Sequence, residues 1–96
     1  MKNTNYTSLC IPRIESSINK DYVLSIFNKL NIGIINKIHE IPLRYNQDFK
    51  RIIIYIKLNT TEKSLTVQKL INENKSVKVV HDMPWYWKVV KTEPQQ

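Results

Sequence analysis

The chain has 96 residues and a net charge of +7, from 15 Lys and Arg against 8 Asp and Glu. This length fits one domain with one modest core, and the apolar fraction of 42% argues against a wholly disordered chain. No apolar run approaches the roughly 18 residues of a membrane span, and the polar start is unlike a signal peptide, so we expect an intracellular protein of cytoplasm or nucleus. The charge favours an anionic partner such as nucleic acid, while an AT-rich coding sequence would also produce the many Lys and Asn and the lack of Ala.

Enzymatic and metal-dependent functions find little support in the sequence. Cys10 is the only cysteine, which excludes an internal disulfide and a multi-cysteine metal site. One glycine excludes a glycine-rich phosphate loop, and His39 and His81 lack a residue at a spacing that would orient a general base. We therefore expect no enzyme, no metal, no cofactor and no small-molecule substrate.

The first half of the chain predicts a strand, a helix and a second strand. The strand covers residues 8–14 and contains Pro12, which cannot donate to a ladder. Asn19 is a plausible N-cap for a helix that runs to about Asn31, and Gly33 follows it as an end signal. Residues 34–41 fit a half-exposed strand, and residues 42–50 a flexible connection.

The second half predicts a strand from about residue 50 to 59, a helix from about 62 to 74 capped by Thr60 or Thr61, and a strand at 77–80. Residues 84–90, which carry the aromatic cluster Trp85, Tyr86 and Trp87, continue extended after it. One domain at residues 8–90 would then lie between flexible ends at 1–7 and 91–96. The βαββαβ order predicts an α+β fold of the ferredoxin-like type, with a four-stranded antiparallel sheet and two helices on one face.

The strand at residues 51–58 separates into two chemically different rows. One row consists of the apolar residues Ile52, Ile54, Ile56 and Leu58, and the opposite row consists of Arg51, Ile53, Tyr55 and Lys57. A strand that only closed a core would have little use for two cations and an aromatic ring on its far side. We interpret this second row as a possible binding surface on the sheet face that the helices leave uncovered.

The chain resembles the RNA recognition motif family over about residues 8–80. Arg51 fits the leading cation of the third-strand octamer of that family, Tyr55 its second stacking aromatic, and Ile53 stands where the first aromatic is expected. Residues 9–14 are similar in spacing to the first-strand hexamer, with Cys10 at the aromatic position. The composition and the ending at residues 84–88 also resemble small proteins of large double-stranded DNA viruses.

The resemblance and the charge together predict a module that binds single-stranded nucleic acid, RNA before DNA. Aromatic rings on the open sheet would stack on bases while nearby cations neutralise phosphates. The candidate binding residues are Cys10, Pro12, Arg51, Ile53, Tyr55, Lys57, Lys78, Trp85, Trp87 and Lys88. For Cys10 the alternative is a small packed residue, and for Tyr55 it is a ring that merely covers the sheet.

Two alternatives remain open for the tryptophans. Alternation sends Trp85 and Trp87 to one side of an extended segment and Tyr86 to the other. Both tryptophans could close an edge of the core, or they could extend the binding surface. As a third use they could anchor a protein partner or a homodimer, together with the Ile53 row, in a protein-interaction module of the same fold.

Overall fold

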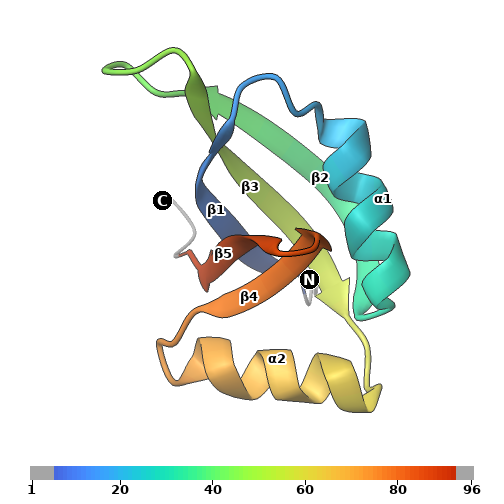
Figure 1. Cartoon of the computed structure of the whole chain (residues 1–96). Helices are drawn as coiled ribbons and strands as arrows, with labels where there is room; N and C mark the ends of the chain where they lie inside the picture. The colour runs from blue at the N-terminus through green and yellow to red at the C-terminus, as the bar shows by residue number, and fades with distance from the viewer. Residues whose placement is uncertain (1–5, 93–96) are drawn as a thin grey trace.

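The computed structural model describes residues 6–92 and shows five strands and two helices (Figure 1). The elements are β1 (Thr7–Glu15), α1 (Lys20–Leu30), β2 (Gly33–Pro42), β3 (Phe49–Leu58), α2 (Glu62–Asn72), β4 (Val77–Asp82) and β5 (Trp85–Lys91). β1 begins and β5 ends one residue outside the predicted domain bounds of 8 and 90. The predicted flexible ends otherwise fall on residues 1–5 and 93–96, which lie outside the described residues. In the described part of the chain no helix is long and apolar enough to cross a membrane.

The two helices begin at side-chain caps. The Asn19 side chain accepts a hydrogen bond of 2.9 Å from the backbone N–H of Tyr22, and Thr61 accepts one of 3.2 Å from Ser64. Each cap satisfies an N–H that has no partner within the first helical turn. The helix end that Gly33 was expected to mark lies at Asn31, which adopts the left-handed conformation with φ of 55°.

The sheet has five antiparallel strands in the order β2-β3-β1-β5-β4, so the prediction of four strands is wrong. The chain reverses at Met83 and Pro84, and the segment expected to continue from β4 returns beside it as β5. β5 therefore lies between β1 and β4, and its described pairs with β1 are limited to Leu9 with Lys91 and Cys10 with Val90, followed by a hydrogen bond of 2.9 Å from the Thr92 N–H to the Ser8 carbonyl. Beyond these pairs the two strands diverge, and the β4–β5 hairpin turns across the direction of β1, β2 and β3 (Figure 1).

One apolar core joins both helices to the same face of the sheet. The row Ile52, Ile54 and Ile56 of β3 is fully buried, as its alternation predicts. The other buried apolar residues of this cluster are Leu9, Ile11, Ile14, Val23, Ile26, Phe27, Ile32, Val67, Ile71, Val79, Trp87 and Val89. The opposite face of the sheet carries no helix among the described residues, and we call it the open face.

Gly33 starts β2 at a place where two backbones come close. A Cβ atom at this position would lie 2.3 Å from the carbonyl oxygen of Lys57 and 2.9 Å from the Cα of Leu58. Neither backbone atom can move without shifting the β2–β3 ladder. We expect Gly33→Ala to lower the free energy of unfolding by about 1 to 3 kcal/mol, as overpacking typically does.

Urea unfolding followed by circular dichroism measures this effect, and Asn36→Ala, at an exposed position of the same strand, is the matched control. A Gly33→Ala midpoint equal to that of the native protein would contradict the close approach.

Candidate nucleic-acid interface

The pairing register assigns side chains of all five strands to the open face. Residues directly opposite each other in a ladder project to the same side, and neighbours along a strand alternate. Arg51, Ile53, Tyr55 and Lys57 of β3 project away from the buried row of isoleucines, so the four predicted residues share this face. The register adds Ser8, Cys10, Glu15, Ile34, Lys37, His39, Ile41, Phe49, Lys78, Val80, Tyr86, Lys88 and Val90.

Tyr55 lies half-buried near the middle of β3. Ser8 of β1 stands opposite it on one side and Lys37 of β2 on the other. The His39 ring packs edge-on, with its centroid 5.6 Å from that of Tyr55 and an angle of 75° between the ring planes. This contact restricts the orientation of the tyrosine ring while Lys37 and Lys57 place positive charge on either side of it.

Tyr86 forms a second aromatic position that the sequence reasoning did not select. It lies exposed on the open face of β5, and the ammonium of Lys78 is 5.0 Å from the centroid of its ring. Lys88 stands directly opposite Lys78 in the β4–β5 ladder, so the predicted residues Lys78 and Lys88 are neighbours. The alternation that sends Tyr86 away from the tryptophans was visible in the sequence, and it was the available signal for this residue.

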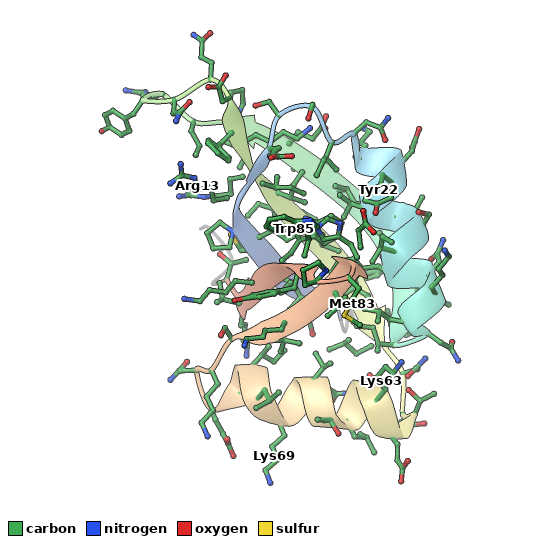
Figure 2. The ribbon with its side chains drawn as sticks, in the orientation of Figure 1. Arg13, Tyr22, Lys63, Lys69, Met83 and Trp85 are labelled. Atoms are coloured by element: carbon green, nitrogen blue, oxygen red, sulfur yellow. The ribbon has the colours of Figure 1, made fainter. Side chains whose placement is uncertain are left out.

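The two tryptophans lie on the helix side of β5 and do not extend the open face. Trp87 is 5% exposed and stacks on the His81 ring, with centroids 4.2 Å apart and planes within 14°. Tyr22 of α1 packs edge-on against the indole at 6.0 Å and donates a hydrogen bond of 3.1 Å to the carbonyl of His81. Trp87 is therefore a core residue, as the first alternative held. Trp85 is 66% exposed and projects from the start of β5 (Figure 2).

The two residues of β1 that were predicted to bind nucleic acid, Cys10 and Pro12, present little exposed surface. Cys10 is only 7% exposed, between its ladder partners Ile53 and Val90, and burial raises the pKa of its thiol although the Arg51 guanidinium acts in the opposite direction. Pro12 lies half-buried where the β1–β3 register shifts. The next residue, Arg13, places its guanidinium 4.0 Å from the centroid of the Phe49 ring.

The charge on the open face is of one sign over most of its area. The register places five described cations there, Lys37, Arg51, Lys57, Lys78 and Lys88, and Arg13 adds a sixth through its contact with the Phe49 ring at the far end of β1. The register places one described carboxylate there, that of Glu15, opposite Phe49 at the far end of β1. Glu40, by contrast, lies on the helix side of β2, where it forms an ion pair of 2.7 Å with Lys50. The middle of the face thus has cations without neutralising acids.

The described residues contain no group of three or more His, Cys, Asp or Glu placed to hold a metal ion. Comparison with protein-family models, with curated proteins and with solved structures finds no match. The functional argument therefore depends on the open face itself.

Proposed function

We propose that this domain binds single-stranded nucleic acid, RNA before DNA, on its open face, and that it acts as a binding module and not as an enzyme. The observation that carries the proposal is the combination of two half-exposed or exposed tyrosines with six cations and a single, peripheral acid on one uncovered sheet face. Stacking of a base on an aromatic ring is worth about 1 to 3 kcal/mol, and cations beside the ring neutralise the phosphates.

The two tyrosines would act as separate stacking positions. Tyr55 is level with Ser8 on β1, Val90 is level with Cys10, and Tyr86 lies four residues before Val90. At about 3.3 Å per residue, Tyr86 lies about 13 Å along β5 from Val90, on the part of β5 that diverges from β1. A single strand of several nucleotides would be needed to reach both, and its phosphates would pass Arg51 and Lys88 between them.

Low sequence preference follows from the same geometry. Every base has a face that can stack on tyrosine, and lysine or arginine contacts to phosphate carry no base identity. The resemblance to the RNA recognition motif family supports the proposal through the strand pattern, with β5 in the place next to β1 and β4 added outside it. Ile53 and Cys10 remain where that family has aromatic residues.

The test is a pair of matched tyrosine variants. We expect Tyr55→Ala to weaken binding of a labelled single-stranded RNA about 5- to 150-fold, which corresponds to the 1 to 3 kcal/mol of one stacked base. Tyr45→Ala is the control, because Tyr45 is 99% exposed in the loop between β2 and β3. Fluorescence anisotropy at two salt concentrations measures both variants. If Tyr55→Ala and Tyr45→Ala lowered the affinity for RNA equally and only slightly, binding would depend on charge alone.

A protein-interaction module, including a homodimer, is the second candidate. Ile34 is 72% exposed on the open face, and Ile53 lies between the cations of β3, so the face has apolar residues that a partner would cover. Trp87 cannot serve as an anchor, because it is buried beneath Tyr22 and His81. Sedimentation at high concentration separates the homodimer from the nucleic-acid proposal: a stable dimer that excludes RNA would favour the former.

A further inference from the structure

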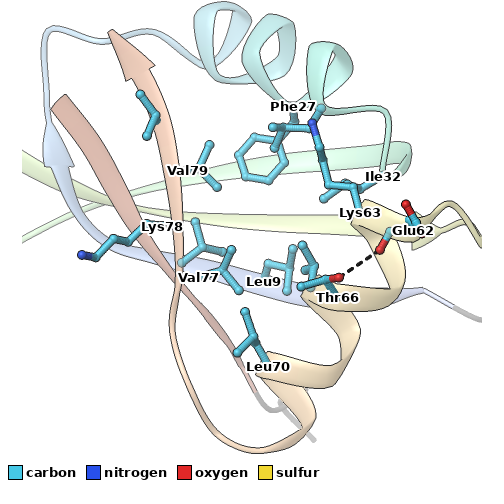
Figure 3. Close-up of a pocket in the computed structure, with 14 residues that line it drawn as sticks. Leu9, Phe27, Ile32, Glu62, Lys63, Thr66, Leu70, Val77, Lys78 and Val79 are labelled. Atoms are coloured by element: carbon cyan, nitrogen blue, oxygen red, sulfur yellow. Dashed lines mark hydrogen bonds between the residues drawn. The ribbon is translucent and has the colours of Figure 1, made fainter. Parts of the chain in front are cut away.

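A second surface, away from the open face, lies between the two helices. α1 and α2 cover the same sheet face but leave a cleft of about 700 Å³ between them, bordered by β4 (Figure 3). Its inner wall is apolar and is formed by Leu9, Phe27, Val67, Leu70, Val79 and Val89. This volume lies in the range of about 300 to 1,000 Å³ that is usual for ligand sites.

The edge of β4 forms one wall of the cleft. β4 is one of the two edge strands of the sheet, with β5 on one side and no described strand on the other, and β2 is the opposite edge. The four consecutive residues Val77–Val80 all line the cleft, although neighbouring side chains of a strand project to opposite sides. The wall therefore includes the main chain of β4, with the N–H and C=O groups of its outer edge.

We infer that this cleft binds an extended peptide segment of a partner protein, which adds a sixth strand beside β4. Strand addition at an exposed edge draws its affinity from main-chain hydrogen bonds and its specificity from alternate side chains. On the helix side, every second side chain of the segment would enter the apolar cleft against Val79, Val67 and Leu70. The segment would therefore have apolar residues at alternate positions.

The remaining side chains of the segment would project to the open-face side of β4, where Lys78 and Lys88 would select their charge. Lys78 stands directly opposite Lys88, and like charges in this arrangement repel each other. A carboxylate on the neighbouring position of an added strand would relieve that repulsion. A second copy of this chain, paired edge to edge through β4, would instead add a second Lys78 on the neighbouring strand and a second Lys88 one strand beyond it. The arrangement therefore fits an acidic partner segment better than self-association.

The probe is a labelled peptide of about ten residues that alternates valine and glutamate, with a valine and lysine peptide of equal length as its control. By anisotropy we expect the glutamate peptide to bind at least about fivefold more tightly, as one to two favourable exposed charge pairs allow. Lys78→Glu should reverse the preference. Amide hydrogen exchange of residues 77–82 should slow when the glutamate peptide is bound, which docking in the cleft without strand addition would not produce.

Two tryptophan substitutions on α2 locate the site. Thr66 is exposed and lines the cleft, and its hydroxyl donates a hydrogen bond to the Glu62 carbonyl of the preceding turn (Figure 3). Thr66→Trp should fill the cleft and weaken peptide binding about tenfold or more, whereas Leu65→Trp, at an exposed neighbour outside the cleft, should not.

The outcomes that would overturn the inference are distinct from those that bear on the open face. No peptide binding up to about 1 mM would overturn it, as would equal affinity for the two peptides. Concentration-dependent dimerisation that Thr66→Trp abolishes would assign the cleft to a second copy. RNA binding should be the same in Thr66→Trp and in the native protein, so a parallel loss of RNA binding would also count against a separate peptide site.

Discussion

Replacing Trp87 with alanine is expected to lower the free energy of unfolding by about 3 to 5 kcal/mol, the usual cost of removing a large buried aromatic ring. The indole stacks on His81 at 4.2 Å and meets the edge of Tyr22 at 6.0 Å, so its loss removes contacts that connect β5 to β4 and α1. A chain of this length is expected to have about 5 to 14 kcal/mol of stability, so Trp87→Ala would leave little of it.

Trp85→Ala is the matched control, because Trp85 belongs to the same strand but is 66% exposed. Its effect should lie within about 0.5 kcal/mol of zero, as for most surface substitutions. Urea unfolding followed by circular dichroism measures both variants, and Trp87→Phe gives a milder change if the alanine variant does not fold. Equal destabilisation by Trp85→Ala and Trp87→Ala would contradict the assignment of one tryptophan to the core and the other to the surface.

The local sequence pattern was sufficient to predict most of the helices and strands. The alternation of β3 separates Ile52, Ile54 and Ile56 from the polar row without any knowledge of the other strands, and the structure shows these three fully buried. Residue type alone similarly predicted the cap at Asn19, and it left Thr60 and Thr61 as the candidates for the second cap, which lies at Thr61. These features depend only on contacts close in sequence or on the period of one strand.

The β4–β5 hairpin could not be predicted from the local sequence pattern. Its turn at Met83 and Pro84 lacks the Asn-Gly or Asp-Gly pair that marks a two-residue hairpin, so the chain from residue 77 to 90 could be interpreted as one extended run. Which face receives Trp87 depends further on the register between β4 and β5, and a shift by one residue would exchange the two faces. Nothing local fixes that register.

The candidate site likewise contains residues that a single strand predicts and residues that only the pairing of strands brings together. The sequence predicted that the four residues of β3 share a face because they occupy alternate positions of a single strand. Lys37, His39 and Tyr86 reach the open face through the pairing of separate strands, and β2 has a register shift between Ile35 and Lys37 that the sequence does not reveal. A surface assembled from several strands therefore requires the registers of all of them.

A double charge reversal on the open face is expected to have the largest effect on nucleic-acid binding. Arg51→Glu with Lys57→Glu lowers the net charge by four, from +7 to +3. Each phosphate contact with a single strand is worth about 0.7 of a decade in affinity at 0.1 M salt relative to 1 M, so the loss of two contacts weakens binding about 25-fold before repulsion is added. The slope of the logarithm of affinity against the logarithm of salt concentration should fall in magnitude by about 1.4.

The matched control is Lys20→Glu with Lys63→Glu, which has the same net charge of +3. Lys20 and Lys63 lie exposed in the first turns of α1 and α2, where a carboxylate is favourable to the helix dipole, so folding should be retained. Both helices cover the opposite face of the sheet, and beyond a screening length of about 10 Å at 0.1 M salt their charges contribute little to a strand bound on the open face. Anisotropy titrations at several salt concentrations measure both variants. If the helix pair reduced affinity and slope as much as the β3 pair, binding would follow net charge and not the open face; if only the β3 pair did so, the phosphates would pass beside Tyr55, where a base can stack.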